Sequence, residues 1–145
     1  MAKEILTTDN IELNVAFSTK EEAIRHTGDI LVKNGYVETS YVEKMLEREE
    51  LTSTFMGNYV AIPHGTEDAK KMVKETGLTI VTVPEGVDFG EGNIVKVLIG
   101  IAGKGDEHLD ILSKIALVCS EEENIQKILD AATKEDIINL FDEVN

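Results

Sequence analysis

The sequence predicts an α/β fold, a single-domain sandwich in which helices flank a mixed sheet of four or five strands. Helical and β-prone patterns alternate along the chain, which ends in a run of helices. The 145 residues suffice for one compact hydrophobic core, and no internal repeat, low-complexity tract or linker divides them. We therefore expect residues 1–145 to form one domain.

Two amphipathic helices are expected in the N-terminal part of the chain. Ser18–Glu21 has the capping-box pattern, and apolar residues then recur at helical spacing until Gly35 ends the run. The second helix should extend from Ser40 to about Glu50, with apolar residues inward and charged residues outward.

The chain then changes to an extended pattern. Tyr59–Ile62 is a short β-prone stretch that ends at Pro63, and Thr66 can cap a short helix through Val73.

Two longer strands are expected next, from Leu78 to Val83 and from Ile94 to Ala102. The segment between them, Pro84–Gly92, is rich in turn-forming residues. The two strands should therefore form a hairpin with a wide loop.

Three further helices complete the predicted fold. Asp106 is the candidate cap of the first, Ser120–Glu123 is a capping box for the second, and Thr133 caps the last. The predicted inner face of the first of these helices consists of Leu109, Leu112, Ile115, Ala116 and Cys119. The predicted apolar face of the last consists of Ile137, Ile138, Leu140 and Phe141.

The charge balance limits the partners. With 14 basic and 28 acidic residues, the formal net charge is -14, which repels nucleic acid and anionic membrane surfaces. The start of the sequence lacks the basic stretch and apolar run of a signal peptide, and no later apolar run approaches transmembrane length. We expect a cytoplasmic protein that neither binds nucleic acid nor inserts into a membrane.

His64 follows directly after the predicted strand, between Pro63 and Gly65. Proline fixes the direction in which the strand exits, and glycine permits another chain to approach closely. Thr66 begins a helix whose N–H groups favour a nearby anion. Neutral imidazole has one nitrogen with an available lone pair, so His64 is a candidate nucleophile. A histidine that only fills a tight turn would show the same pattern.

A second histidine, His108, follows a glycine-rich loop and lies in the first turn of a helix. If the strands ending at Ile62 and Ala102 are parallel neighbours, His64 and His108 lie at the same carboxyl edge of the sheet, where α/β folds usually bind ligands. Such a pair could bind metal or share a phosphoryl group. Metal is the poorer choice, since the sequence offers no two-histidine helical motif and no third ligand at an obvious spacing. Taken alone, His108 is more typical of a solvated first-turn residue.

Arg48 lies near the end of the second predicted helix, before three hydroxyl residues in a row at 52–54. The planar guanidinium group binds phosphate through two parallel hydrogen bonds. The alternative is an ion pair with Glu47 or Glu49, and a run of hydroxyls is usually only a turn.

Two further reactive side chains are interpreted as structural. His26 lies at the edge of an apolar helical stripe and is expected to be a boundary residue. Cys119 is the sole cysteine, so no intramolecular disulfide can form, and its place on an inner helix face predicts a buried, inert thiol.

The segments Arg48-Glu-x-x-x-Ser-Thr-x-x-Gly57 and Ala61-Ile-Pro-His-Gly-Thr66 resemble the mannitol/fructose-type enzyme IIA family of the bacterial sugar phosphotransferase system. In this family the histidine accepts phosphate while the arginine and a second histidine assist, which implies these roles for His64, Arg48 and His108. The family fold, a mixed sheet flanked by helices, agrees with the pattern above. The mannitol branch in particular is resembled at Gly35–Val37, Tyr41–Leu46, Pro84–Gly90, Ile99–Ala102 and Glu107–Leu109.

The resemblance implies a phosphotransferase component that needs no metal or cofactor. His64 would attack the phosphohistidine of the histidine-containing phosphocarrier protein and pass the group to the cysteine of a IIB component for mannitol uptake. The IIB and membrane IIC components are expected to be separate polypeptides. Besides Arg48 and His108, the expected phosphate-binding residues are Ser53, Thr54, Gly65 and Thr66.

Two other functions remain open. A related nitrogen-regulatory IIA would keep the same histidine chemistry but signal through partner proteins by its phosphorylation state. A binding module on this fold would take up no phosphate at all.

Overall fold

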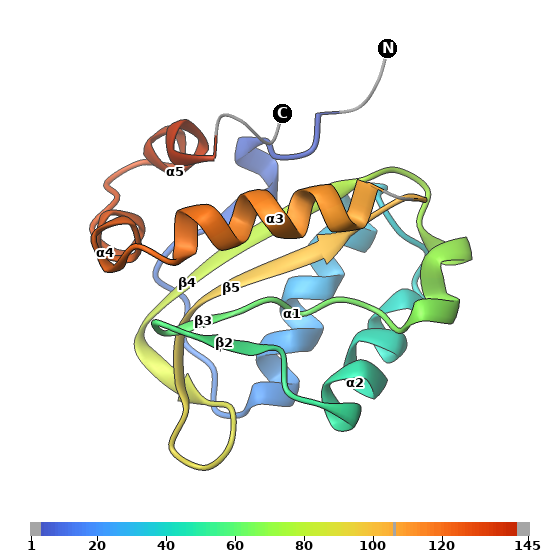
Figure 1. The fold of residues 1–145 in the computed structure, drawn as a ribbon, viewed down its shortest axis with the longest axis horizontal. Coiled ribbons are helices and arrows are strands. Elements are labelled where there is room, and N and C mark those ends of the chain that lie inside the picture. Colours follow the sequence, from blue (N-terminus) through green and yellow to red (C-terminus); the bar gives the residue numbers. More distant parts are fainter. Residues whose placement is uncertain (1–3, 106, 142–145) are drawn as a thin grey trace.

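The computed structural model describes residues 4–105 and 107–141. A five-stranded mixed sheet, in the order β1-β4-β5-β3-β2, lies between two layers of helices (Figure 1). The strands are β1 (Ile11–Glu12), β2 (Phe55–Gly57), β3 (Val60–Ala61), β4 (Gly77–Asp88) and β5 (Ile94–Ala102). The helices are α1 (Lys20–Lys33), α2 (Tyr41–Leu51), α3 (Glu107–Cys119), α4 (Glu122–Leu129) and α5 (Lys134–Leu140), with short 3-10 helices η1 (Thr8–Asn10) and η2 (Glu67–Met72). The predicted α/β sandwich is confirmed.

The strand directions bring the two candidate histidines to one edge. β4 and β5 form the expected antiparallel hairpin, and β3 runs parallel to β5, with Val60 opposite Val97 and Ala61 opposite Leu98. The chain beyond β3 and the chain beyond β5 therefore leave the sheet at the same carboxyl edge. His64 extends this pairing with an isolated parallel bridge to Ile101.

Each face of the sheet has its own hydrophobic cluster. On one face α1 and α2 cover side chains of the central strands, whereas α3, α4 and α5 cover the other face (Figure 1). Alternation along β4 divides its residues between the two clusters: Val81 packs toward α1, and Leu78 and Ile80 pack toward α3.

Two helix starts differ from the predicted capping boxes. The N-cap of α1 is Thr19 rather than Ser18, because the Thr19 hydroxyl accepts the Glu22 backbone N–H at 3.2 Å. The N-cap of α4 is Glu121, since the Ser120 hydroxyl donates back to a carbonyl of α3 and does not cap α4. The Thr133 capping box of α5 is confirmed, while the predicted cap Asp106 lies outside the described residues.

β4 continues further than predicted, through Pro84 to Asp88. A register shift between Thr82 and Val87 accommodates the proline and Gly86, whose φ is 82°. Pairing then resumes with Val87 opposite Val95, so only the residues after Asp88 form the wide loop.

The inner face of α3 was predicted correctly at Ile115 and Cys119, but the prediction included Leu109 and Ala116 and missed Ile111. Ile111, Ile115 and Cys119 are buried, whereas Leu109 is 70% exposed and Ala116 is also exposed. The buried stripe has strict four-residue spacing, which places Leu109 on the opposite side of the helix.

Candidate functional site

A cavity of about 220 Å³ opens at the carboxyl edge shared by β3 and β5. It brings together His64 after β3, His108 at the start of α3 and Arg48 near the end of α2. Three of the side chains that the sequence singled out thus line one pocket, although 60 residues separate Arg48 from His108 in the chain. The other lining residues are Tyr41, Leu51, Gly65, Thr66, Glu67, Lys70, Val73 and Gly103.

The backbone around His64 fixes the orientation of its ring. The Pro63 carbonyl accepts the Ile101 N–H at 2.9 Å, which ties the turn to β5. His64 Nδ1 lies 2.8 Å from the carbonyl oxygen of Ile62. A carbonyl oxygen can only accept a hydrogen bond, so Nδ1 carries the proton in the neutral ring and Nε2 carries the available lone pair.

Gly65 is held by a buried tyrosine that was not among the predicted site residues. The Tyr41 hydroxyl accepts the Gly65 N–H at 2.9 Å and donates to the Ile101 carbonyl at 2.9 Å. A Cβ atom on Gly65 would lie 2.6 Å from a ring carbon of Tyr41, so glycine is needed for this close approach. The group that packs closely against Gly65 is therefore the Tyr41 side chain, which belongs to α2. Burial raises the pKa of Tyr41 to about 12, which keeps its hydroxyl protonated.

His108 faces His64 across the pocket. Their ring centroids are 5.2 Å apart and the ring planes are inclined by 51°. Gly103 permits this placement, because a Cβ there would come within 2.4 Å of the His108 Cβ.

Both imidazoles are biased toward the neutral form. Burial lowers the pKa of His64 below its ordinary value, and the positive charge of Arg48 adds to this, whereas the hydrogen bond to Ile62 and the negative charge of Glu49 oppose it. Burial likewise lowers the pKa of His108, and the neighbouring His64 and Lys70 lower it further. A neutral His64 at pH 7 is the form that can act as a nucleophile.

Arg48 supplies the positive charge of the pocket. Its Nη1 donates to the carbonyl of Thr52 at 2.7 Å, and the rest of the guanidinium retains donors for a ligand. Of the other charged lining residues, Lys70 pairs with Glu67 at 3.0 Å. The pocket therefore favours an anion, even though the whole chain has a net charge of -14.

The remaining candidate phosphate ligands have other partners. Thr54 is buried and its hydroxyl donates to the Glu49 carboxylate at 2.7 Å, while the Ser53 hydroxyl accepts the Phe55 N–H at 3.2 Å. Thr66 lines the pocket, but its hydroxyl donates to Asp68 and makes no capping hydrogen bond to η2.

The predicted burial of Cys119 and the predicted boundary position of His26 are confirmed. His26 Nε2 lies 2.9 Å from a carboxylate oxygen of Glu12 at the rim of the core. Cys119 is buried, and burial raises its pKa to about 12. Within residues 4–105 and 107–141, no cluster of three or more His, Cys, Asp or Glu side chains is arranged to hold a metal ion. No helix in this part of the chain is long and apolar enough to span a membrane.

Comparisons with known proteins agree with this geometry. Residues 4–144 match the family described as phosphoenolpyruvate-dependent sugar phosphotransferase system, EIIA 2. The chain is 61% identical to the mannitol-specific phosphotransferase enzyme IIA component of Geobacillus stearothermophilus, over 100% of both proteins.

Solved structures share the fold at substantial sequence identity. The crystal structure of IIA mannitol from Escherichia coli superposes with a TM-score of 0.87 at 40% identity, over 94% of this chain and 98% of that chain. The complex of enzyme IIAMTL and phosphorylated enzyme IIBMTL from the same organism matches with a TM-score of 0.89 at 39% identity, over 95% of this chain and 97% of that chain. The chain therefore belongs to the EIIA 2 family of the phosphoenolpyruvate-dependent sugar phosphotransferase system.

Proposed function

We propose that this protein is a cytoplasmic phosphohistidine carrier that accepts a phosphoryl group from the histidine-containing phosphocarrier protein and passes it to the cysteine of a IIB component during mannitol uptake. The observation that carries the proposal is the hydrogen bond from His64 Nδ1 to Ile62, which leaves the Nε2 lone pair at a pocket that favours anions. We assign the phosphoryl group to Nε2 on this basis.

In the first transfer, the Nε2 lone pair of His64 attacks phosphorus while the P–N bond to the donor histidine breaks, and that bond's electron pair returns to the donor ring. In the second transfer, the thiolate of the IIB cysteine attacks phosphorus and the P–Nε2 bond breaks. Negative charge spreads over the equatorial oxygens in both steps. We assign to Arg48 and His108 the role of donating hydrogen bonds to those oxygens, because both line the pocket that contains His64. We place Gly65 and Thr66 at the rim of the phosphoryl site, because both line the same pocket.

The assignment to mannitol has its support in sequence. The relative that matches over its full length at 61% identity is named for mannitol, and so is the E. coli IIA protein in complex with phosphorylated IIB. A nitrogen-regulatory role is disfavoured by this identity. On this proposal both the donor and the acceptor of the phosphoryl group are proteins, so transfer does not require mannitol to enter the pocket.

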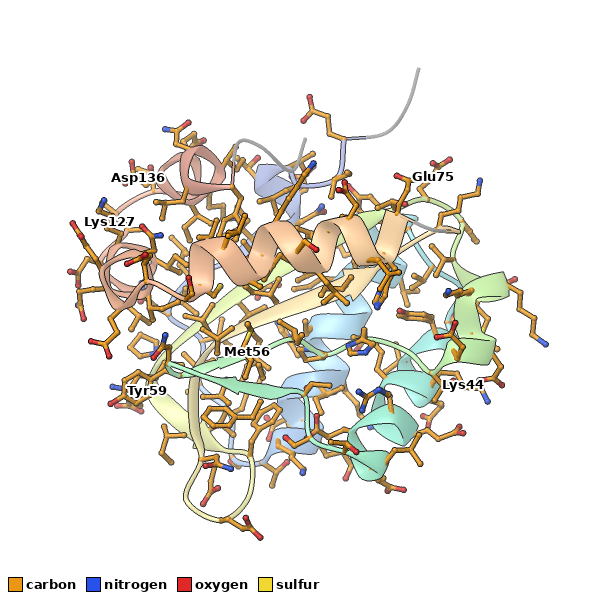
Figure 2. All side chains as sticks on the ribbon, in the orientation of Figure 1. Lys44, Met56, Tyr59, Glu75, Lys127 and Asp136 are labelled. Carbon is orange, nitrogen blue, oxygen red and sulfur yellow. The ribbon has the colours of Figure 1, made fainter. Side chains whose placement is uncertain are left out.

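A protein partner also suits the surface around the pocket. Leu51 lines the pocket and is 72% exposed, and Leu109, next to His108, is 70% exposed. Met56 and Tyr59 on the β2–β3 hairpin are also partly exposed, but Tyr59 lies at the end of the hairpin away from this pocket (Figure 2) and neither residue lines it. Exposed apolar side chains grouped near a reactive residue mark protein interaction sites. The acidic surface would attract a partner whose contact face is basic.

Phosphorylation in a reconstituted relay tests the proposal. Incubation with phosphoenolpyruvate, its kinase and the phosphocarrier protein should add acid-labile phosphate to the wild-type chain and to His26→Ala, but not to His64→Ala. Addition of a mannitol-specific IIB should then remove the label. Labelling of His64→Ala would refute the assignment of the nucleophile. A wild-type chain that takes up no phosphate would support a binding module, and label that cannot pass to IIB would support a regulatory role.

A further inference from the structure

We propose that Glu49 is a positioning residue for phosphoryl transfer, whose buried carboxylate anchors, through Thr54, the backbone that orients both His64 and Arg48. The inference rests on the proposed role of His64.

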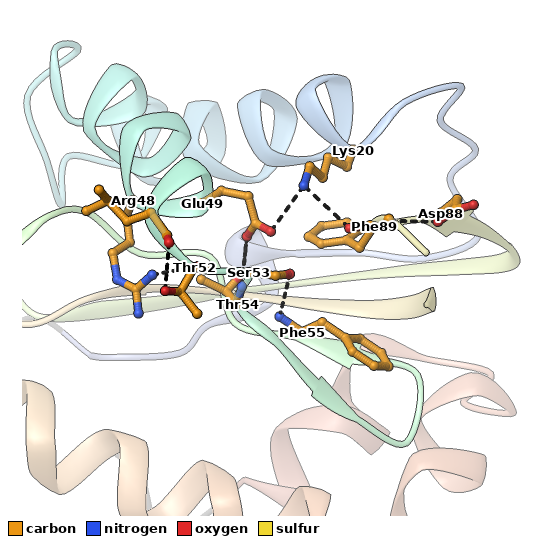
Figure 3. Close-up of polar contacts among 11 residues, drawn as sticks. Lys20, Arg48, Glu49, Thr52, Ser53, Thr54, Phe55, Asp88 and Phe89 are labelled. Carbon is orange, nitrogen blue, oxygen red and sulfur yellow. Dashed lines mark hydrogen bonds and ion pairs between the residues drawn. The ribbon is translucent and has the colours of Figure 1, made fainter. Parts of the chain in front are cut away.

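The Glu49 carboxylate is almost completely withdrawn from water. The residue is 5% exposed, near the end of α2. Its Oε1 accepts the Thr54 backbone N–H at 2.9 Å and the Thr54 hydroxyl at 2.7 Å, and its Oε2 lies 3.5 Å from Lys20 Nζ (Figure 3). A buried carboxylate requires such donors, because burial without them is very costly. The carboxylate and Thr54 therefore form one fixed unit.

Glu49 is poorly suited to stabilising α2 itself. The C-terminal end of a helix carries partial negative charge, so an acidic side chain two residues before Leu51 opposes the helix dipole. Violations of such local rules are concentrated at functional sites. The presence of Glu49 at this position is better explained by its hydrogen bonds to Thr54, which lies beyond the end of α2.

One line of hydrogen bonds leads from this carboxylate to the proposed nucleophile. The Thr54 carbonyl accepts the Ile62 N–H at 3.1 Å, and the Ile62 carbonyl accepts from His64 Nδ1 at 2.8 Å. Glu49 fixes Thr54, Thr54 fixes Ile62, and the Ile62 carbonyl selects the tautomer and direction of the imidazole. A shift of Thr54 would therefore weaken the bond that keeps the proton on Nδ1.

The same segment holds the arginine of the pocket. The Arg48 guanidinium donates to the Thr52 carbonyl at 2.7 Å, and Thr52 lies two residues before the threonine that Glu49 clamps. Figure 3 shows the guanidinium and the Glu49 carboxylate on either side of this turn. The turn at residues 52–54 therefore positions Arg48 through the Thr52 carbonyl, and the Glu49 carboxylate holds the same turn at Thr54.

This arrangement gives Thr54 a different role from the expected phosphate ligand. Its hydroxyl already donates to Glu49, and the residue is buried. A phosphate ligand would act only when phosphate is present. A positioning residue changes the His64 ring in the unphosphorylated protein as well.

The test compares Glu49→Gln and Thr54→Val with two controls. In Glu49→Gln, only an uncharged amide oxygen can face the two Thr54 donors, and the amide nitrogen then faces Lys20, which offers no acceptor. The hydrogen bonds to Thr54 therefore weaken without a change of side-chain size. Thr54→Val removes the hydroxyl and keeps the shape, whereas Thr54→Ser should restore the clamp. Glu43→Gln is the matched control, because Glu43 lies on the same helix and pairs with Arg25 on the surface at 2.9 Å.

Two measurements are needed for each variant. In free protein, nitrogen-15 NMR of His64 should show the protonated-Nδ1 tautomer losing its dominance in Glu49→Gln and Thr54→Val, with wild-type spectra for Thr54→Ser and Glu43→Gln. The rate of phosphoryl uptake per folded molecule should fall about tenfold or more in the first two variants, as expected when a reacting group is misplaced.

The proposal is wrong if Glu49→Gln and Thr54→Val remain folded and keep both the wild-type His64 spectrum and the wild-type rate, whatever their unfolding temperatures. A variant with lower stability alone would make Glu49 merely structural. If Glu49→Gln does not fold, Thr54→Val decides the question. A wild-type chain that takes up no phosphate would refute the proposed function, while the tautomer comparison would still test the role of Glu49.

Discussion

Replacement of Tyr41 with phenylalanine keeps the buried ring but removes the hydroxyl that joins two parts of the pocket. In the folded protein this hydroxyl accepts the Gly65 N–H at 2.9 Å and donates to the Ile101 carbonyl at 2.9 Å. Phenylalanine therefore leaves the Gly65 N–H and the Ile101 carbonyl without this hydrogen-bonding partner. Tyr41 is only 3% exposed, so the lost hydroxyl lies in a buried part of the site.

The expected cost follows from these two hydrogen bonds. A buried group left unsatisfied costs about 1–3 kcal/mol, and Gly65 is near enough to the pocket for water to replace part of the loss. We expect the free energy of unfolding to fall by about 1–3 kcal/mol in total. For a chain of 145 residues this corresponds to a decrease in Tm of about 3–9 °C.

Urea unfolding and calorimetry measure this loss, with Tyr59→Phe as the matched control. Tyr59 is 50% exposed, so the same chemical change there should alter stability by less than about 0.5 kcal/mol. Phosphoryl uptake by the folded Tyr41→Phe protein should also slow, because the turn that carries His64 loses the Tyr41 bridge between Gly65 and Ile101, while it keeps the bond from the Ile101 N–H to the Pro63 carbonyl. Unfolding of Tyr41→Phe at the wild-type temperature and urea concentration would show that the hydroxyl bridge contributes nothing.

Further outcomes follow from the pocket and the core. Arg48→Lys keeps the charge but loses the planar fork, so phosphoryl transfer should slow while stability, measured by urea unfolding, changes by less than about 1 kcal/mol; equal damage to stability would indicate a structural arginine. Because burial raises its pKa to about 12, the Cys119 thiol should resist iodoacetamide at pH 8 in folded protein and react once urea unfolds it, as mass spectrometry would detect. Since the pKa of His64 lies below its ordinary value of 6.5, the rate of uptake should decline as pH falls, with the midpoint of the decline below pH 6.5. As pH falls, His64 of the unfolded chain binds its proton at a higher pH than His64 of the folded protein. The free energy of unfolding should therefore decrease as pH falls through 6.5, which urea unfolding at several pH values would reveal. NMR titration should show the pKa of His108 rising on phosphorylation of His64, because an anion beside it favours its protonated form; an unmoved titration would place His108 outside the phosphoryl site.

Much of the architecture was predictable because the relevant patterns are local. Two β-prone runs on either side of a turn-rich segment identified the β4–β5 hairpin, and helical spacing identified α1 and α2 to within a residue or two. The inference that His64 and His108 meet needed only one assumption about topology, the parallel pairing of β3 and β5, and the structure confirms that pairing.

The contacts that position the site were not predictable in this way. Tyr41 begins a helix with an ordinary amphipathic pattern, and nothing in its spacing shows that its hydroxyl reaches Gly65 across the fold. Glu49 looked like one more charged residue near a helix end, yet it is buried against Thr54. Leu109 matched the helical period as well as Ile111 did, and only the angle at which α3 packs on the sheet separates an exposed from a buried residue.

The two side chains most directly implied in transfer share one mode of attachment. His64 is held by the Ile62 carbonyl and Arg48 by the Thr52 carbonyl, at 2.8 Å and 2.7 Å respectively. A carbonyl oxygen only accepts, so each bond occupies one donor of its side chain and leaves the opposite end for the phosphoryl group: a lone pair on Nε2 and further N–H donors on the guanidinium. Neither anchor titrates near neutral pH, so the geometry should persist while the imidazoles change charge. We therefore expect the pH dependence of transfer to report the ionisation of His64 and His108 and not a rearrangement of the site.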